Sequence, residues 1–215
     1  MATPSAVLFD NDGLLLDTES VWTRGEAAMF ERRGKEFTLA DKHAVIGQSA
    51  KVAGEILAER LDEPGNAQGL IAELDEIVIA ALEDGIDAMV GALELVAALR
   101  EREMPLGLVS NSPTRFIARA LELVGMEGHF DSVISGHEVP APKPAPDCYL
   151  AACEELGVTP ASAVALEDSP TGVAAAKAAG LTVVGVPSLP GIELHEADHL
   201  ADSLQDARVV ELLCL

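Results

Sequence analysis

The chain has 215 residues, of which 49% are apolar and 3% aromatic, and it carries a formal net charge of −22 with a pI near 4.3. This length and apolar share predict a folded protein with one substantial core filled mainly by Ala, Val and Leu, and they exclude a disordered chain. The acidic balance argues against nucleic acid and anionic membranes as partners, because phosphate backbones select basic surfaces.

The cysteines and the first residues indicate a cytoplasmic protein. Cys148, Cys153 and Cys214 are an odd number without metal-type spacing, so we expect reduced thiols. The segment Met1–Ser5 lacks the basic region of a signal peptide. No apolar stretch approaches the roughly 18 residues that a membrane span needs, so no membrane span is expected.

The apolar run Ala6–Phe9 predicts a buried strand near the start of the chain. After it, apolar residues recur at helical spacing in three stripes, which begin near Val21, Val52 and Leu70, and no strand-like run interrupts them. This pattern predicts an all-helical insertion at residues 18–87, too long for a loop and large enough for a small bundle.

The remaining residues, 1–17 and 88–215, are assigned to an α/β core. From Gly91 onward one unit recurs, consisting of an amphipathic helix, a glycine and a short β-branched run. This alternation predicts a doubly wound, Rossmann-like parallel sheet covered on both faces. The strands expected after the first are Leu106–Val109, Val133–Ile134, Ala163–Leu166 and Leu181–Val184, with His199–Ala201 as a candidate sixth at the edge.

Polar residues gather where these predicted strands end. In an open α/β sheet, ligands bind beyond the carboxyl ends of the strands, so these residues are expected to form one site. They are Asp10 and Asp12 after the first strand, Ser110 and Asn111 after the second, Lys143 past the third, and Glu167 and Asp168 after the fourth.

The four acids predict a divalent cation. Asp10, Asp12, Glu167 and Asp168 would repel one another without one, and an all-oxygen ligand set suits Mg²⁺ together with a substrate phosphate. The metal and Lys143 would turn an acidic pocket into a site for a phosphoryl group. Each element alone has an ordinary explanation, as an acidic turn, a solvated lysine or a helix cap. Only their order at successive strand ends makes them a site.

The chain resembles the haloacid dehalogenase superfamily over its whole length. The segments "VLFDNDG", "LVSNS", "KPAPD" and "VALEDSPTGVAAAKAAG" look like its four motifs in order. The helical insertion is similar to the small α-helical cap of the β-phosphoglucomutase and sugar-phosphate phosphatase group.

The resemblance implies a role for each site residue. Asp10 would be the nucleophile that forms an aspartyl-phosphate, and Asp12 the general acid and base. Asp12 would also offer a carbonyl oxygen to Mg²⁺, which Asp168 and Glu167 would hold directly or through water. The phosphoryl oxygens would be held by Ser110, Asn111 and Lys143.

Two departures from the mutase pattern favour a phosphatase. Trp22 stands where the related mutases carry a histidine, and Ala50 stands where they carry an arginine, in Gly47-Gln48-Ser49-Ala50. Glu19, Trp22 and Gln48 are candidate substrate contacts. Trp22 fits a place in the core of the cap equally well.

Three functions therefore stay open. The first is a Mg²⁺-dependent phosphatase that hydrolyses a small phosphorylated metabolite, a sugar or polyol phosphate. The second is a β-phosphoglucomutase-like hexose-phosphate mutase. The third is a non-catalytic phospho-acceptor domain, which Asp12 and the insertion disfavour. The expected partner is a small-molecule phosphate ester, and the expected assembly is a monomer or a weak homodimer.

Overall fold

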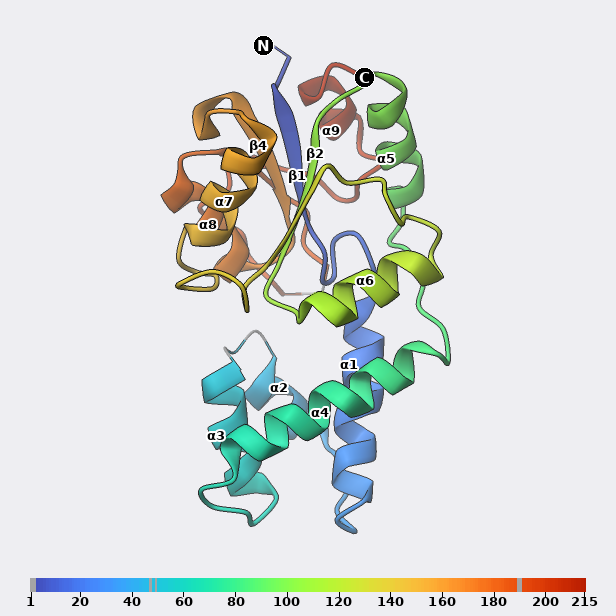
Figure 1. The fold of residues 1–215 in the computed structure, drawn as a ribbon, viewed down its shortest axis with the longest axis vertical. Coiled ribbons are helices and arrows are strands. Elements are labelled where there is room, and N and C mark those ends of the chain that lie inside the picture. The colour runs from blue at the N-terminus through green and yellow to red at the C-terminus, as the bar shows by residue number, and fades with distance from the viewer. Residues whose placement is uncertain (1–2, 47, 49, 189–190) are drawn as a thin grey trace. The chain divides into compact units, whose positions relative to one another are not determined.

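The computed structural model describes residues 3–46, 48, 50–188 and 191–215. The chain divides into two compact units, one of Met1–Thr18 with Asp87–Leu215 and one of Glu19–Ile86 (Figure 1). Among the described helices, none is both long and apolar enough to cross a membrane.

The first unit is built on a six-stranded sheet whose paired strands all run parallel. This confirms the predicted doubly wound α/β architecture, including the sixth strand at the edge. The strands lie in the order β3-β2-β1-β4-β5-β6. They are β1 (Ala6–Asp10), β2 (Leu106–Ser110), β3 (Ser132–Ser135), β4 (Ala163–Glu167), β5 (Thr182–Gly185) and β6 (His199–Leu200).

The strand order reverses at β1, which pairs with β2 on one side and with β4 on the other. The register brings the last residues of these strands level, because Asp10 pairs with Val109 and Phe9 pairs with Leu166. Such a reversal leaves a crevice at the carboxyl ends of the strands. The residues that follow β1, β2 and β4 therefore meet at one edge of the sheet.

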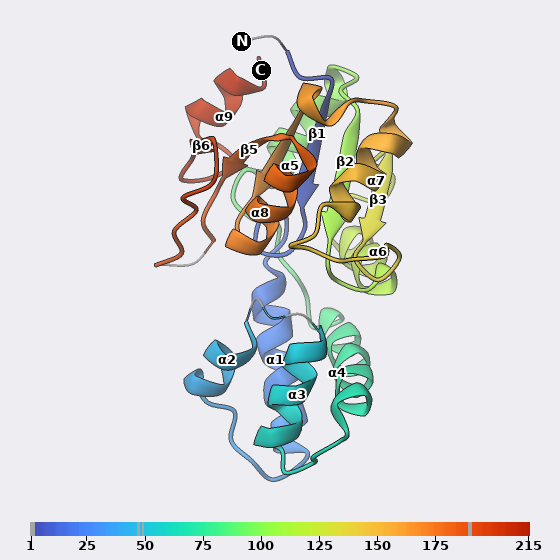
Figure 2. The same cartoon turned by 90° about the vertical axis from the view of Figure 1, so that its left-hand side faces the viewer.

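Helices cover both faces of the sheet. Figures 1 and 2 show α7 and α8 on one side of the strands and α5 and α6 on the other. Every residue of β1, β2 and β4 is buried, which explains why these strands are continuous apolar runs without alternation. The core-unit helices are α5 (Ala92–Glu101), α6 (Thr114–Leu123), α7 (Asp147–Leu156), α8 (Pro170–Ala179) and α9 (Ala207–Leu212), with a 3-10 turn at Pro160–Ser162.

The second unit contains helices only among its described residues. Helix α1 enters it from the core unit, and the four helices are α1 (Thr18–Glu31), α2 (Leu39–Val45), α3 (Ala50–Arg60) and α4 (Ala67–Leu82). On α4, one face is buried, including Leu70, Leu74 and Val78. Arg33 joins two parts of the unit through ion pairs to Glu63 and Glu73, at 2.6 and 2.7 Å.

The sequence prediction misses two short helices, α2 and α9. Helix α2 begins with a capping box, in which the side chain of Thr38 accepts the N–H of Asp41 and the side chain of Asp41 accepts the N–H of Thr38. The Thr-x-x-Asp spacing was a signal for this start. With 7 and 6 residues, both helices are shorter than the window of about 11 residues in which an apolar period can be recognised.

Candidate active site

The turn after β1 places two acids beside a glycine. Asp10 is the last residue of β1 and is buried, and Asn11 and Asp12 follow it. Gly13 has a φ of +85°, and a Cβ added there would lie 2.4 Å from the Oδ2 atom of Asp168. Only glycine allows the backbone both this conformation and this approach. The turn thereby brings the loop after β1 against the loop after β4.

Three of the predicted acids meet at this edge. Asp10, Glu167 and Asp168 are buried, and each offers a carboxylate oxygen within 4.8 Å of the others. Burial raises the pKa of Asp10 well above its usual value, although Lys143 opposes the shift. Burial and the charge of Glu167 raise the pKa of Asp168 to about 7. Without a cation, this cluster therefore resists full ionisation.

Lys143 reaches the same cluster from the loop before α7. Its ammonium group donates to the Oδ1 atom of Asp10 and the Oε1 atom of Glu167, each at 2.6 Å, and to the carbonyl of Val109 at 2.9 Å. Burial acts to lower the pKa of Lys143, but the carboxylates of Asp10 and Glu167 outweigh burial and hold that pKa well above its usual value. The buried ammonium group is therefore charged.

The donor set fits a hard divalent cation. One ammonium group faces the three clustered carboxyl groups of Asp10, Glu167 and Asp168, so the cluster has an excess of acidic groups. All three offer oxygen atoms, which hard cations such as Mg²⁺ and Ca²⁺ prefer. A cation bound there would supply the missing positive charge.

The side chain of Asp12 is held by donors from two loops. Its Oδ2 atom accepts hydrogen bonds from the hydroxyl groups of Ser110 and Ser112, at 2.5 and 3.0 Å. Its Oδ1 atom accepts from the amide of Asn11 at 3.2 Å. Ser112 is a site residue that the sequence prediction missed, because a serine just before Pro113 and a helix is typical of a helix start. The loop after β2 thus orients the second acid of β1.

Asn111 holds the loop that carries Lys143. Its side-chain amide donates to the carbonyl of Lys143 at 3.1 Å, and its Oδ1 atom accepts the N–H of Lys143 at 3.0 Å. This pair of bonds ties the end of β2 to the backbone of Lys143. A direct part for Ser110 and Asn111 in phosphate binding stays a prediction.

Three further residues shape the cluster and were not predicted. Ser188, in the loop after β5, donates to the Oδ2 atom of Asp168 at 2.6 Å. The hydroxyl group of Tyr149 donates to the Oε1 atom of Glu167 at 2.5 Å. Gly172 leaves room for Glu167, since a Cβ there would lie 1.9 Å from the Oε2 atom. Ser188 follows the end of β5, so the expectation that polar residues after parallel strands meet at one edge of the sheet applies to it as well.

This arrangement can be compared with known proteins. The family model for haloacid dehalogenase-like hydrolases matches residues 4–180. The chain belongs to this family. The match spans the loops after β1, β2 and β4 and the segment that carries Lys143, so all four predicted motifs lie within it.

This hydrolase is similar in sequence to proteins of named activity over most of its length. It is 32% identical over 207 residues to validoxylamine A 7′-phosphate phosphatase from Streptomyces hygroscopicus subsp. limoneus, with 94% of each chain covered. It is 30% identical over 195 residues to hexitol phosphatase B from Escherichia coli strain K12, with 87% of each chain covered. The crystal structure of CbbY from Rhodobacter sphaeroides in complex with phosphate is 27% identical, with a TM-score of 0.83 over 94% of this chain and 95% of that chain.

The candidate substrate contacts of the hydrolase lie in the second unit. Glu19 forms an ion pair with Lys42, which also pairs with Glu26 at 2.8 Å. Trp22 is partly exposed on α1, and Gln48 is exposed. Gly47 and Ser49, which flank Gln48 in the segment compared with the mutases, lie outside the described residues. The roles of Glu19, Trp22 and Gln48 stay predictions.

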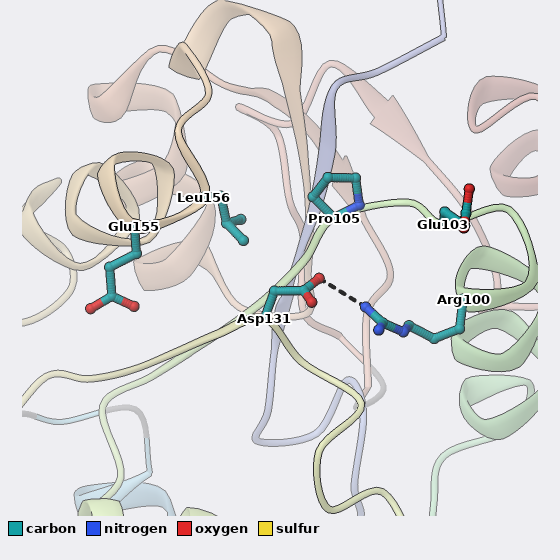
Figure 3. A pocket seen from close by; sticks show the side chains of 6 residues that line it. All are labelled: Arg100, Glu103, Pro105, Asp131, Glu155 and Leu156. Atoms are coloured by element: carbon teal, nitrogen blue, oxygen red, sulfur yellow. Dashed lines mark hydrogen bonds and ion pairs between the residues drawn. The ribbon is translucent and has the colours of Figure 1, made fainter.

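A surface pocket of the hydrolase lies apart from the acid cluster (Figure 3). Pro105 and Asp131 directly precede β2 and β3, so this pocket is at the amino ends of these strands. Within it, Arg100 and Asp131 form an ion pair at 2.8 Å. The pocket has a volume of about 460 Å³ and is lined by Arg100, Glu103, Pro105, Asp131, Glu155 and Leu156, none of which is a predicted site residue.

Proposed function

We propose that this hydrolase is a Mg²⁺-dependent phosphatase that releases phosphate from a small sugar or polyol phosphate through an aspartyl-phosphate on Asp10. The observation that carries the proposal is the contact between the buried ammonium group of Lys143 and the carboxylate of Asp10, beside Glu167 and Asp168. This geometry provides a nucleophile, a fixed positive charge and oxygen ligands at one point.

The substrate class is supported by the relatives. The name of hexitol phosphatase B pairs a phosphatase with a polyol, and the name of validoxylamine A 7′-phosphate phosphatase pairs a phosphatase with a phosphorylated small molecule. Both are at least 30% identical to this chain over most of its length. We therefore place a polyhydroxylated phosphate ester first among the substrates to be tested.

In the first step, a carboxylate oxygen of Asp10 attacks the phosphorus atom of the ester. The new P–O bond forms as the bond to the substrate oxygen breaks, and the electron pair of that bond goes to the leaving alkoxide. Asp12 gives the alkoxide a proton. Lys143, already in contact with Asp10, stabilises the charge on the phosphoryl oxygens as they pass close to it.

In the second step, water attacks the aspartyl-phosphate, and Asp12 takes a proton from that water. The bond between the phosphorus atom and the oxygen of Asp10 breaks, which regenerates the carboxylate and releases inorganic phosphate. The hydroxyl groups of Ser110 and Ser112 orient Asp12 for both proton transfers. Mg²⁺, held by Asp10, Asp168 and the carbonyl oxygen of Asp12 with Glu167 nearby, would supply positive charge for the transferring group.

We further propose that residues 18–87 act as a movable cap. The chain leaves the core unit after residues 15–17 and returns to it at residues 87–89, and these two segments are hydrogen-bonded to each other. The N–H of Asp17 donates to the carbonyl of Asp87 at 2.9 Å, and the N–H of Met89 donates to the carbonyl of Leu15 at 2.9 Å. Two connections that are paired by backbone hydrogen bonds suit a hinge.

The test is a phosphate-release screen over sugar, polyol, nucleotide and glycolate phosphates, with Mg²⁺ and with a chelator. We expect release from sugar or polyol phosphates with Mg²⁺, a loss of about 10³-fold or more in Asp10→Asn because the nucleophile is absent, and no loss in the surface control Asp202→Asn. Equal turnover by Asp10→Asn, or full activity in chelator, contradicts the proposal.

Two other outcomes would identify the alternative functions. Interconversion of hexose phosphates stimulated by a bisphosphate, without net release of phosphate, would identify a mutase. A long-lived phosphoprotein without turnover would identify a phospho-acceptor domain.

A further inference from the structure

Tyr149 contacts both members of the buried ion pair at the active site. It lies in the first turn of α7, and its side chain is fully buried. Its hydroxyl group donates to the Oε1 atom of Glu167 at 2.5 Å. The ammonium group of Lys143 lies over its ring, 5.0 Å from the ring centroid. The proposed reaction steps do not use this residue.

The carboxylate of Glu167 is confined from two sides. Its Oε1 atom accepts from Tyr149 and also from Lys143, the latter at 2.6 Å. Its Oε2 atom lies so close to Gly172 that any side chain at that position would displace it. Tyr149 of α7 thus orients the Oε1 atom through a hydrogen bond, and Gly172 of α8 limits the position of the Oε2 atom by van der Waals contact.

In this structure the ammonium group of Lys143 donates to three acceptors. An ammonium group has three N–H bonds, and the acceptors here are Asp10, Glu167 and the carbonyl of Val109. The position of Glu167 therefore decides how far the ammonium group stands from Asp10. A shift of Glu167 toward Lys143 would draw the positive charge away from the nucleophile.

We propose that Tyr149 is a positioning residue for phosphoryl transfer. Its hydroxyl group fixes the carboxylate of Glu167, and this carboxylate together with the ring holds the ammonium group of Lys143 against Asp10. The inference rests on the proposed function. Without the hydroxyl group, the Oε1 atom of Glu167 keeps Lys143 as a close donor and pulls on it more strongly. Charge that builds up during transfer is stabilised only by donors already in place, so the loss falls on the reaction step.

The variant Tyr149→Phe tests this role, because it removes the hydroxyl group and keeps the ring. We expect kcat to fall about tenfold, which corresponds to about 1.4 kcal/mol, with KM changed by less than about threefold. Orthovanadate, which mimics the five-coordinate transition state, should bind about tenfold more weakly, while orthophosphate should bind as before.

A matched control removes another buried hydroxyl group that donates to a carboxylate. Ser132 lies at the start of β3 and donates to Glu155 at 2.7 Å, at the opposite end of the sheet. Ser132→Ala should leave kcat and orthovanadate binding unchanged. If Tyr149→Phe also leaves kcat within about twofold of the unmodified chain, the positioning role is overturned.

A double-mutant cycle distinguishes positioning from simple packing. If Tyr149 acts through Glu167, adding Tyr149→Phe to Glu167→Gln should lower kcat by less than about twofold further. Fully additive losses would overturn the inference, because they would mean that the two residues act independently.

A spectroscopic readout keeps the inference testable if Tyr149→Phe does not fold. The chain has one tyrosine, so 3-fluorotyrosine incorporation labels this residue alone. We expect its ¹⁹F resonance to shift when orthovanadate and Mg²⁺ are added, and a resonance that does not move would overturn the inference. A chain that hydrolyses no phosphate ester would overturn the proposed function. Release of phosphate at equal rates with and without the hydroxyl group would overturn only the role of Tyr149.

Discussion

At the scale of single residues, burial disfavours the ionised forms of the acids in the candidate active site, and nearby positive charge offsets this cost. Asp10 and Asp168 both have raised pKa values because they are buried among other carboxylates. Lys143 is the cation that the chain itself supplies. We therefore expect the stability of the core unit to depend on pH and on a bound cation.

We predict that the metal-free protein loses stability as pH rises. The pKa of the Asp168 carboxyl group is about 7 in the folded chain and 3.8 in its usual, exposed state, so between these values the folded state binds more protons than the unfolded state. The unfolding free energy therefore falls between about pH 4 and about pH 7, by up to about 4 kcal/mol from this group.

Urea unfolding in chelator, at about pH 5 and about pH 8, measures this effect against Asp168→Asn, which lacks the titrating group. The unmodified chain should lose stability relative to the variant at the higher pH, and Mg²⁺ should restore it. A constant difference between the two proteins at both pH values would contradict the prediction.

At the scale of elements, the site depends on loops that are tied to one another. Asn111, after β2, holds the backbone of Lys143 in the loop before α7, and Ser188, after β5, holds Asp168 after β4. Each tie joins loops that follow different strands. The positions of Lys143 and Asp168 are thereby tied to the spacing of the strands.

We predict that Asn111→Ala lowers kcat for phosphate release by about 10- to 100-fold, because Lys143 loses its support and small misplacements at a reacting centre are costly. The loss of two hydrogen bonds should also lower the unfolding free energy by about 1–3 kcal/mol. The matched control is Asn66→Ala, since Asn66 bonds Glu63 in the second unit. Equal effects of the two variants on kcat would contradict the prediction.

The sequence predicts the strands and the longer helices well. The strands follow from continuous apolar runs, and the longer helices follow from stripes that end at glycine, as at Gly157 and Gly180. The residues at the carboxyl ends of β1 and β4 are found by the same argument, because the order of a parallel sheet brings them together.

The supporting residues of the site could not be predicted in this way. Tyr149 lies on the apolar stripe of α7, where it is indistinguishable from an ordinary core residue. The importance of Gly172 comes from its approach to Glu167 in space, which no local pattern in the sequence encodes. Ser112 looks like a helix cap, but it donates to Asp12.

At the scale of the whole molecule, the chain has two units with separate cores. The proposed ligands Asp10, Asp12, Glu167 and Asp168 all belong to the unit of Met1–Thr18 and Asp87–Leu215. A cation bound by these proposed ligands would therefore stabilise that unit directly. The helical unit has its own apolar core around α4 and its own ion pairs at Arg33.

We predict two transitions in calorimetry, of which Mg²⁺ raises only the one that belongs to the core unit. At a concentration of about 100 times its dissociation constant, Mg²⁺ contributes about 2.7 kcal/mol, which corresponds to a shift of about 5–10 °C. Arg33→Met should lower the other transition and leave the Mg²⁺-dependent one in place. A single transition that moves as a whole with Mg²⁺ would contradict this prediction.

The division into two units also separates the chain's two main chromophores. Its one tyrosine, Tyr149, lies in the core unit, and its one tryptophan, Trp22, lies in the helical unit. The indole therefore reports from a residue of the helical unit, and the phenol reports from a residue of the core unit. If the helical unit moves as the proposed cap, the efficiency of resonance energy transfer from the phenol to the indole will change with the distance between the two rings, and the intrinsic fluorescence of the unlabelled protein would then report that motion.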